Sequence, residues 1–94
     1  MPYRIDISND VLYFLQTVPS KTKSIIKKNL VKLENPFPGR GSGDKEKLIV
    51  AGEEMYRLHI GRSYTAFYII DSKEKVVRVI EVLTIELAHN KYGN

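Results

Sequence analysis

The chain has 94 residues, a formal net charge of +4 and no cysteine. This length supports one modest hydrophobic core, so we predict a single domain over residues 1–94. The absence of cysteine excludes disulfides and thiol nucleophiles, the two widely separated histidines do not suggest a zinc site, and the positive charge favours an anionic partner.

The first third of the chain is predicted to form a strand and two helices. Residues 2–7 alternate apolar and polar side chains, which indicates a half-buried strand. Ser8 or Asn9 can cap a helix that Pro19 ends, and Ser20 can cap a second helix. The apolar positions at helical spacing are Val11, Leu12, Phe14, Leu15 and Val18, followed by Ile25, Ile26, Leu30, Val31 and Leu33. Two helices joined by so short a break usually form a hairpin on a sheet.

The rest of the chain is predicted to form a long loop and three strands. Prolines and glycines in residues 35–46 favour a turn-rich connection. The strands are expected at about residues 47–60, with a break near 51–54, and at about 63–71 and 75–85. We therefore expect an α+β domain in which an N-terminal strand and an αα-hairpin precede a mainly antiparallel three-strand meander, with one sheet packed against the helices.

The strand predicted before residue 60 carries the most informative side chains. Two sets alternate along it, namely Tyr56, Leu58 and Ile60 in one and Met55, Arg57 and His59 in the other. The more apolar set should face the helices, which places Arg57 and His59 on the open face of the sheet. Arg57 would then bind a phosphate or form an ion pair with Glu81. Glu81 is a carboxylate within the last, apolar strand, so it must reach solvent, form an ion pair or act as a base.

These residues resemble the RelE/ParE toxin superfamily of type II toxin-antitoxin systems. The shared pattern is Lys47, a short glycine break, a Tyr-Arg-x-basic strand, Gly61, Tyr64 and an aromatic strand that ends at Asp71. The predicted order of strand, two helices and three strands is also that of the superfamily. The resemblance implies a toxin that a cognate antitoxin protein keeps silent by wrapping its sheet and helices.

Members similar to RelE cut mRNA inside the ribosome, without a metal, by driving a ribose 2′-oxygen onto the adjacent phosphate. This chemistry needs a proton acceptor, cations around the phosphorane and a donor for the leaving 5′-oxygen. The catalytic residues that the resemblance suggests are Arg57, His59, His89 and Tyr92. The phosphate-binding residues that we expect are Lys45, Lys47, Arg62 and Lys91. The implied partners are the ribosome and mRNA, with no metal and no small-molecule cofactor.

Two arginines of the RelE-like pattern have no counterpart at their usual places. Thr65 follows Tyr64 where one arginine is usual, and Ile85 lies at the end of the last strand where another is usual. An alternative is therefore a ParE-like protein that poisons DNA gyrase without being a nuclease, and another is a decayed toxin that only binds its antitoxin. No signal peptide or membrane-spanning segment is apparent, so we expect a cytoplasmic protein without a membrane partner.

Overall fold

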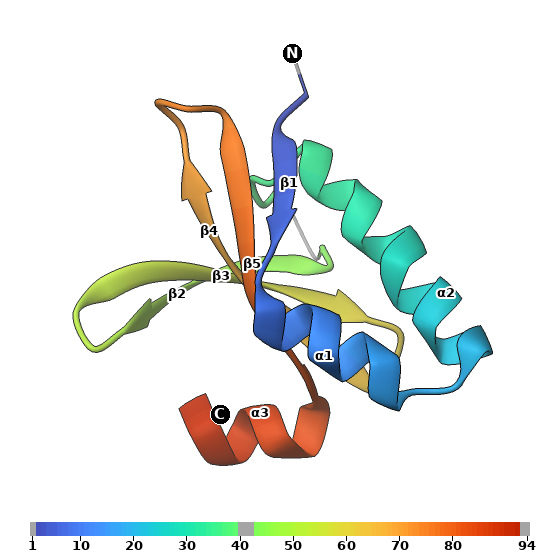
Figure 1. Ribbon diagram of the computed structural model, residues 1–94. Coiled ribbons are helices and arrows are strands. Elements are labelled where there is room, and N and C mark those ends of the chain that lie inside the picture. The colour runs from blue at the N-terminus through green and yellow to red at the C-terminus, as the bar shows by residue number, and fades with distance from the viewer. Residues whose placement is uncertain (1, 40–42, 93–94) are drawn as a thin grey trace.

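The computed structural model describes residues 2–39 and 43–92, which form one five-stranded sheet with helices on both of its faces (Figure 1). The elements are β1 (Arg4–Ile7), α1 (Asn9–Thr17), α2 (Ser20–Leu30), a 3-10 turn (Val31–Glu34), β2 (Lys45–Val50), β3 (Glu53–Ile60), β4 (Tyr64–Asp71), β5 (Val76–Thr84) and α3 (Ile85–Tyr92). The strand order is β1-β5-β4-β3-β2, with β1 parallel to β5 and the other pairs antiparallel. The predicted α+β architecture is confirmed, while residues 40–42 of the predicted loop lie outside the described residues.

Helices α1 and α2 cover one face of the sheet, and the main core lies between these helices and the sheet (Figure 1). Buried side chains of the helices, such as Val11 and Ile26, pack against Leu58 and Ile60 of β3. The predicted alternation of β3 is therefore confirmed, because Arg57 and His59 must point to the opposite face. Not every apolar helix position is in the core, since roughly half of the surface of Leu12, Ile25 and Val31 is exposed.

The two helix starts differ in their caps. Ser8 is the N-cap of α1, where its hydroxyl accepts a hydrogen bond from the Val11 amide at 3.2 Å. The prediction that Ser20 caps the second helix is wrong, because Pro19 occupies the N-cap position and Ser20 is the first helical residue. The proline already has the extended backbone that a cap requires, so the helix begins one residue earlier than a serine cap would place it.

The strand predicted over residues 47–60 is a β-hairpin rather than a broken strand. Residues Ala51 and Gly52 both have positive φ, 51° and 83°, as in the two-residue type I′ turns that match the twist of a hairpin. The turn fixes the register of β2 on β3, so that Val50 lies opposite Glu53 and Glu46 lies opposite Arg57. This register brings an acidic side chain onto the open face beside the arginine.

The turn also makes a stability prediction. The left-handed conformation of Ala51 is unfavourable for a residue with a Cβ, whereas asparagine tolerates it. Ala51→Asn should therefore raise the free energy of unfolding by about 1 kcal/mol, measured by chemical denaturation. Gly52→Ala is the matched comparison and should lower this free energy, because it adds a Cβ at φ 83°. An Ala51→Asn protein that is no more stable than the wild type would contradict the turn.

Helix α3 follows β5 directly and packs on the sheet face opposite α1 and α2. Phe67 of β4 is only 1% exposed, and its ring lies 4.2 Å, centroid to centroid, from the ring of Tyr92 on α3. Phe67 lies opposite Arg57 in register, so α3 covers part of the face that carries Arg57 and leaves the rest open. In residues 2–39 and 43–92, no helix is long and apolar enough to cross a membrane.

Candidate functional site on the open sheet face

A row of side chains crosses four strands on the open face. Glu46 of β2, Arg57 of β3, Phe67 of β4 and Glu81 of β5 are successive partners in the register of the sheet. Side chains of paired residues lie on the same face of a sheet, so these four form a line across it. Together with their polar neighbours they define a cluster that we call the open-face cluster, consisting of Glu46, Arg57, His59, Glu81, Lys91 and Tyr92.

Glu46 holds both basic side chains of β3. Its Oε2 accepts hydrogen bonds from Arg57 Nη2 at 2.7 Å and from Arg57 Nε at 3.2 Å. Its Oε1 lies 3.2 Å from His59 Nε2. The hydrogen bonds from Arg57 and then from His59 hold the pKa of Glu46 below its usual value, so its carboxylate is charged at neutral pH.

The ion pair between Arg57 and Glu81, one of the two roles predicted for Arg57, does not form. The two residues are separated by β4, a span of about 10 Å, and the buried Phe67 ring lies between them. Glu81 instead accepts hydrogen bonds from Lys91 Nζ at 2.6 Å and from the Tyr92 hydroxyl at 2.7 Å. Glu81 is thus ion-paired, as one of its predicted alternatives required, but its partners come from α3 rather than from β3.

Tyr92 contacts two of the residues that form the line across the sheet. Its ring packs on Phe67, directly beside the register position of Arg57, and its hydroxyl donates to Glu81. Burial, and then the hydrogen bond to the negatively charged Glu81, raises the pKa of Tyr92 to about 12. The phenol therefore keeps its proton at neutral pH and is a proton donor rather than a base.

The pKa of Tyr92 predicts a specific alkaline sensitivity. Because the folded pKa of about 12 lies above the ordinary 10.0, the contribution of Tyr92 to stability is complete below pH 10.0 and is lost as pH rises through about 12. Tyr92→Phe keeps the ring but removes the titrating group, so its free energy of unfolding should fall less over this range than that of the wild type. Denaturant unfolding at a series of pH values measures the difference. Tyr68, whose pKa burial also raises, is present in both proteins and cancels. Parallel pH profiles would contradict the prediction.

The structure separates several of the predicted phosphate-binding residues from this cluster. Lys45 and Lys47 pair with Leu58 and Tyr56 in register, so they point to the face opposite Arg57. The Lys47 ammonium also pairs with Glu54 at 2.9 Å. Lys45 and Lys47 therefore lie apart from Arg57, because neighbouring positions on a strand alternate between faces, and their role in binding phosphate stays a prediction.

Arg62 and His89 also lie apart from the paired groups. Arg62 is exposed in the turn between β3 and β4 and borders a hollow of about 230 Å³ with Thr22 and Ile25 of α2. His89 is exposed on α3, the helix that also carries Tyr92. Its side chain forms no hydrogen bond or ion pair within the described part of the chain. Of the predicted site residues, the cluster therefore contains Arg57, His59, Lys91 and Tyr92.

The positions where arginines were expected have structural roles. Thr65 is buried, lies opposite His59 in register, and donates a hydrogen bond from its hydroxyl to the Leu58 carbonyl at 3.3 Å. Ile85 begins α3. An arginine in place of Thr65 would lie beside His59, so its absence removes one positive charge from the cluster.

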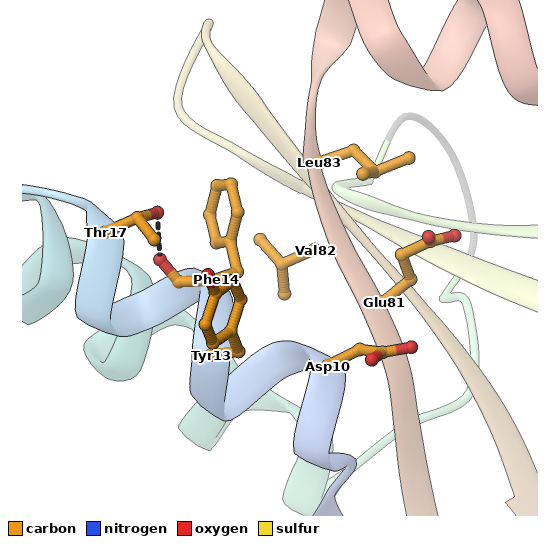
Figure 2. A pocket seen from close by; sticks show the side chains of 7 residues that line it. All are labelled: Asp10, Tyr13, Phe14, Thr17, Glu81, Val82 and Leu83. Atoms are coloured by element: carbon orange, nitrogen blue, oxygen red, sulfur yellow. Dashed lines mark hydrogen bonds between the residues drawn. The ribbon is translucent and has the colours of Figure 1, made fainter.

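A hollow of about 250 Å³ between α1 and β5 is less suited to a phosphate. Its lining residues are Asp10, Tyr13, Phe14, Thr17, Glu81, Val82 and Leu83. Asp10 and Glu81 lie at one end of the hollow and Thr17 at the other (Figure 2). The described residues that line it include two carboxylates and no cationic side chain, so a phosphate would be repelled there. The open-face cluster is therefore the better candidate for an anion.

Residues 5–84 match the family described as the ParE toxin of the type II toxin-antitoxin system parDE. The structure is similar to RelE in the RelE–RelB complex of Pyrococcus horikoshii, with 29% identity, a TM-score of 0.71, and coverage of 89% of this chain and 96% of that one. It is also similar to the Escherichia coli RelBE complex, with 25% identity, a TM-score of 0.56, and coverage of 85% and 93%.

The RelBE2 complex of Mycobacterium tuberculosis has the same fold, with 18% identity, a TM-score of 0.74, and coverage of 89% of this chain and 99% of that one. No curated protein sequence matches the chain. The family match covers most of the chain, and the solved structures agree with it in fold. The chain therefore belongs to the ParE toxin family of type II toxin-antitoxin systems, within the RelE/ParE superfamily.

Proposed function

We propose that this toxin is a ribosome-dependent mRNA endonuclease and that the open-face cluster is its active site. The observation that supports this most is that one partly open face of the sheet carries Arg57, His59 and Tyr92: Arg57 lies opposite Phe67 in register, Tyr92 packs on Phe67, and His59 shares Glu46 with Arg57. A cation, an imidazole and a protonated phenol are the groups that in-line attack of a ribose 2′-oxygen needs. A ribosome-bound substrate would place the protein in the cytoplasm.

Each group has a role in the proposed reaction. His59 accepts the proton of the 2′-hydroxyl, since imidazole is suited to proton transfer near neutral pH. The 2′-oxygen bonds to phosphorus while the bond to the 5′-oxygen breaks, and Arg57 stabilises the charge of the phosphorane. Tyr92, which is protonated at neutral pH, gives a proton to the leaving 5′-oxygen. The products are a 2′,3′-cyclic phosphate and a 5′-hydroxyl, and no metal takes part in these steps.

The proposed partner in the resting state is a cognate antitoxin protein. The structures from P. horikoshii, M. tuberculosis and E. coli are complexes of a toxin with its antitoxin. The net charge of +4 favours an acidic antitoxin. Large apolar side chains are exposed on the two N-terminal helices, at Leu12, Tyr13 and Ile25, and they offer an amphipathic partner apolar contact area.

A second candidate function is poisoning of DNA gyrase by binding alone. Two observations favour it: Thr65 and Ile85 stand where RelE-like nucleases have arginines, and the remaining arginine, Arg57, is already paired with Glu46. Loss of preorganised cations normally costs several kcal/mol of transition-state stabilisation. A decayed toxin that only binds its antitoxin would share these features.

Purified components separate these functions. The toxin is added to ribosomes programmed with a defined mRNA, and primer extension maps new 5′ ends, with ribosome-free mRNA as the control. The nuclease proposal expects cuts only in the presence of ribosomes. A parallel assay measures gyrase-dependent DNA breaks. Breaks in DNA without cuts in mRNA would replace the nuclease by a gyrase poison, and neither activity would indicate a decayed toxin.

A further inference from the structure

The carboxylate of Glu46 contacts both Arg57 and His59, in the way that a bound phosphate would. One of its oxygens receives two hydrogen bonds from the Arg57 guanidinium, and the other lies 3.2 Å from His59 Nε2. A phosphodiester likewise presents two non-bridging oxygens, and arginine binds carboxylate and phosphate with the same forked geometry. An incoming phosphate that used Arg57 and His59 together would therefore need the position that Glu46 holds.

The side chain of Arg57 is held more firmly than the carboxylate of Glu46. Arg57 belongs to β3, an interior strand, and its side chain is 20% exposed, whereas Glu46 belongs to the edge strand β2 and its side chain is 44% exposed. Exposed ion pairs contribute little free energy, so the cost of moving Glu46 into water is small. The arginine would stay in place beside Phe67 while the carboxylate leaves.

The hydrogen bond to His59 allows a different role, in which Glu46 orients the imidazole for proton transfer. In the Ser-His-Asp triad such an orienting carboxylate is buried, whereas the Glu46 side chain is 44% exposed. Here the shortest contact of Glu46, at 2.7 Å, is to Arg57, and this contact covers the cation that a phosphate requires. The geometry therefore favours competition with the substrate over support of the histidine.

We infer that Glu46 is an internal counter-ion of the site, and that an RNA phosphodiester binds Arg57 and His59 by displacing its carboxylate. The inference rests on the proposed function for the identity of the ligand. It gives the toxin a built-in restraint on substrate binding that is independent of any antitoxin. Neutralising Glu46 should then strengthen RNA binding rather than weaken it.

Binding is tested with the full-length toxin, without ribosomes and without a cleavage readout. The probes are a short single-stranded RNA, with affinity measured by fluorescence anisotropy, and inorganic phosphate, with the His59 imidazole signals followed by NMR. Glu46→Gln should bind the RNA about three- to tenfold more tightly than the wild type. The NMR signals of His59 should also shift at a lower phosphate concentration in this variant than in the wild type. The matched control is Glu54→Gln, which removes the same charge from the other face of the hairpin, where Glu54 pairs with Lys47.

The outcomes distinguish the inference from the proposed function. A gain in Glu46→Gln that is absent from Glu54→Gln and is largely lost in the double variant Glu46→Gln/Arg57→Ala supports the counter-ion role, even if no variant cuts mRNA. Equal gains in the two single variants would show a general charge effect and overturn it. Unchanged or weaker binding by Glu46→Gln would overturn it too, even if the wild type proves to be a nuclease. Weaker cleavage together with unchanged binding would assign Glu46 to the orientation of His59.

Discussion

Replacing Phe67 by alanine is expected to lower the free energy of unfolding by about 3–5 kcal/mol. Phe67 is fully buried although it lies on the sheet face away from α1 and α2, because the Tyr92 ring of α3 covers it. The substitution removes this contact as well as the buried ring. We therefore expect α3 to detach from the sheet before the rest of the domain unfolds.

The neighbouring Ile69 provides the matched control. It lies on the same strand and the same face, two residues away, but 40% of its surface is exposed. Ile69→Ala should cost well under half as much as Phe67→Ala, since the free energy follows the apolar area removed from water. Chemical denaturation gives the stabilities, and amide hydrogen exchange in α3 reports its detachment. Equal losses in the two variants would show that α3 does not cover Phe67.

Replacing Arg57 by alanine is expected to slow mRNA cleavage on ribosomes by about 10²- to 10³-fold while leaving the fold intact. The guanidinium is the cation of the cluster that lies opposite Phe67 in register, so its loss removes charge stabilisation of the phosphorane. Its partner Glu46 is exposed enough to be solvated after the substitution, which keeps the cost in stability small. Single-turnover cleavage rates measure the effect, and circular dichroism checks the fold.

Lys45→Ala is the control for general loss of positive charge. Lys45 is one strand away from Arg57 and points to the opposite face, because it pairs with Leu58 in register. Its removal should change the cleavage rate by less than about tenfold, through weaker attraction of RNA alone. If the two substitutions slowed cleavage equally, the reaction would not take place on the open face.

The sequence predicted the face of the site because its strongest pattern is local. The alternation on β3 places Leu58 and Ile60 inward, and burial of these side chains forces Arg57 and His59 outward. The capping serine of α1 is equally local, since Ser8 bonds an amide three residues away. Both features depend on residues that are close in sequence, so the sequence alone was enough to predict them.

The pairing of Glu46 with Arg57 was not predicted, because it depends on the turn at Ala51 and Gly52. Reading Ala51-Gly52 as a break in a strand left the register of β2 undefined. The positive φ of both residues makes a two-residue hairpin, and this register alone places Glu46 beside Arg57 and turns Lys45 and Lys47 away. A glycine in the second turn position was the available signal, but alanine in the first position obscured it.

The docking of α3 has no comparable local signal. Tyr92 meets Phe67 and Glu81 across 25 and 11 positions of the chain, and neither contact follows from periodicity. Glu81 was expected to pair across the sheet because only strand neighbours can be inferred from a strand pattern. The structure replaces that pairing with Lys91 and Tyr92 of the tail.

The most direct test of the proposed reaction uses a single altered nucleotide. After primer extension has located a cut made by the wild-type toxin on ribosomes, an mRNA is prepared with 2′-deoxyribose immediately before that cut, and its cleavage is compared with that of the all-ribose message. Attack by the 2′-oxygen predicts that the all-ribose message is cut there and the altered message remains intact. Cleavage of both messages at the same position would contradict the proposed chemistry.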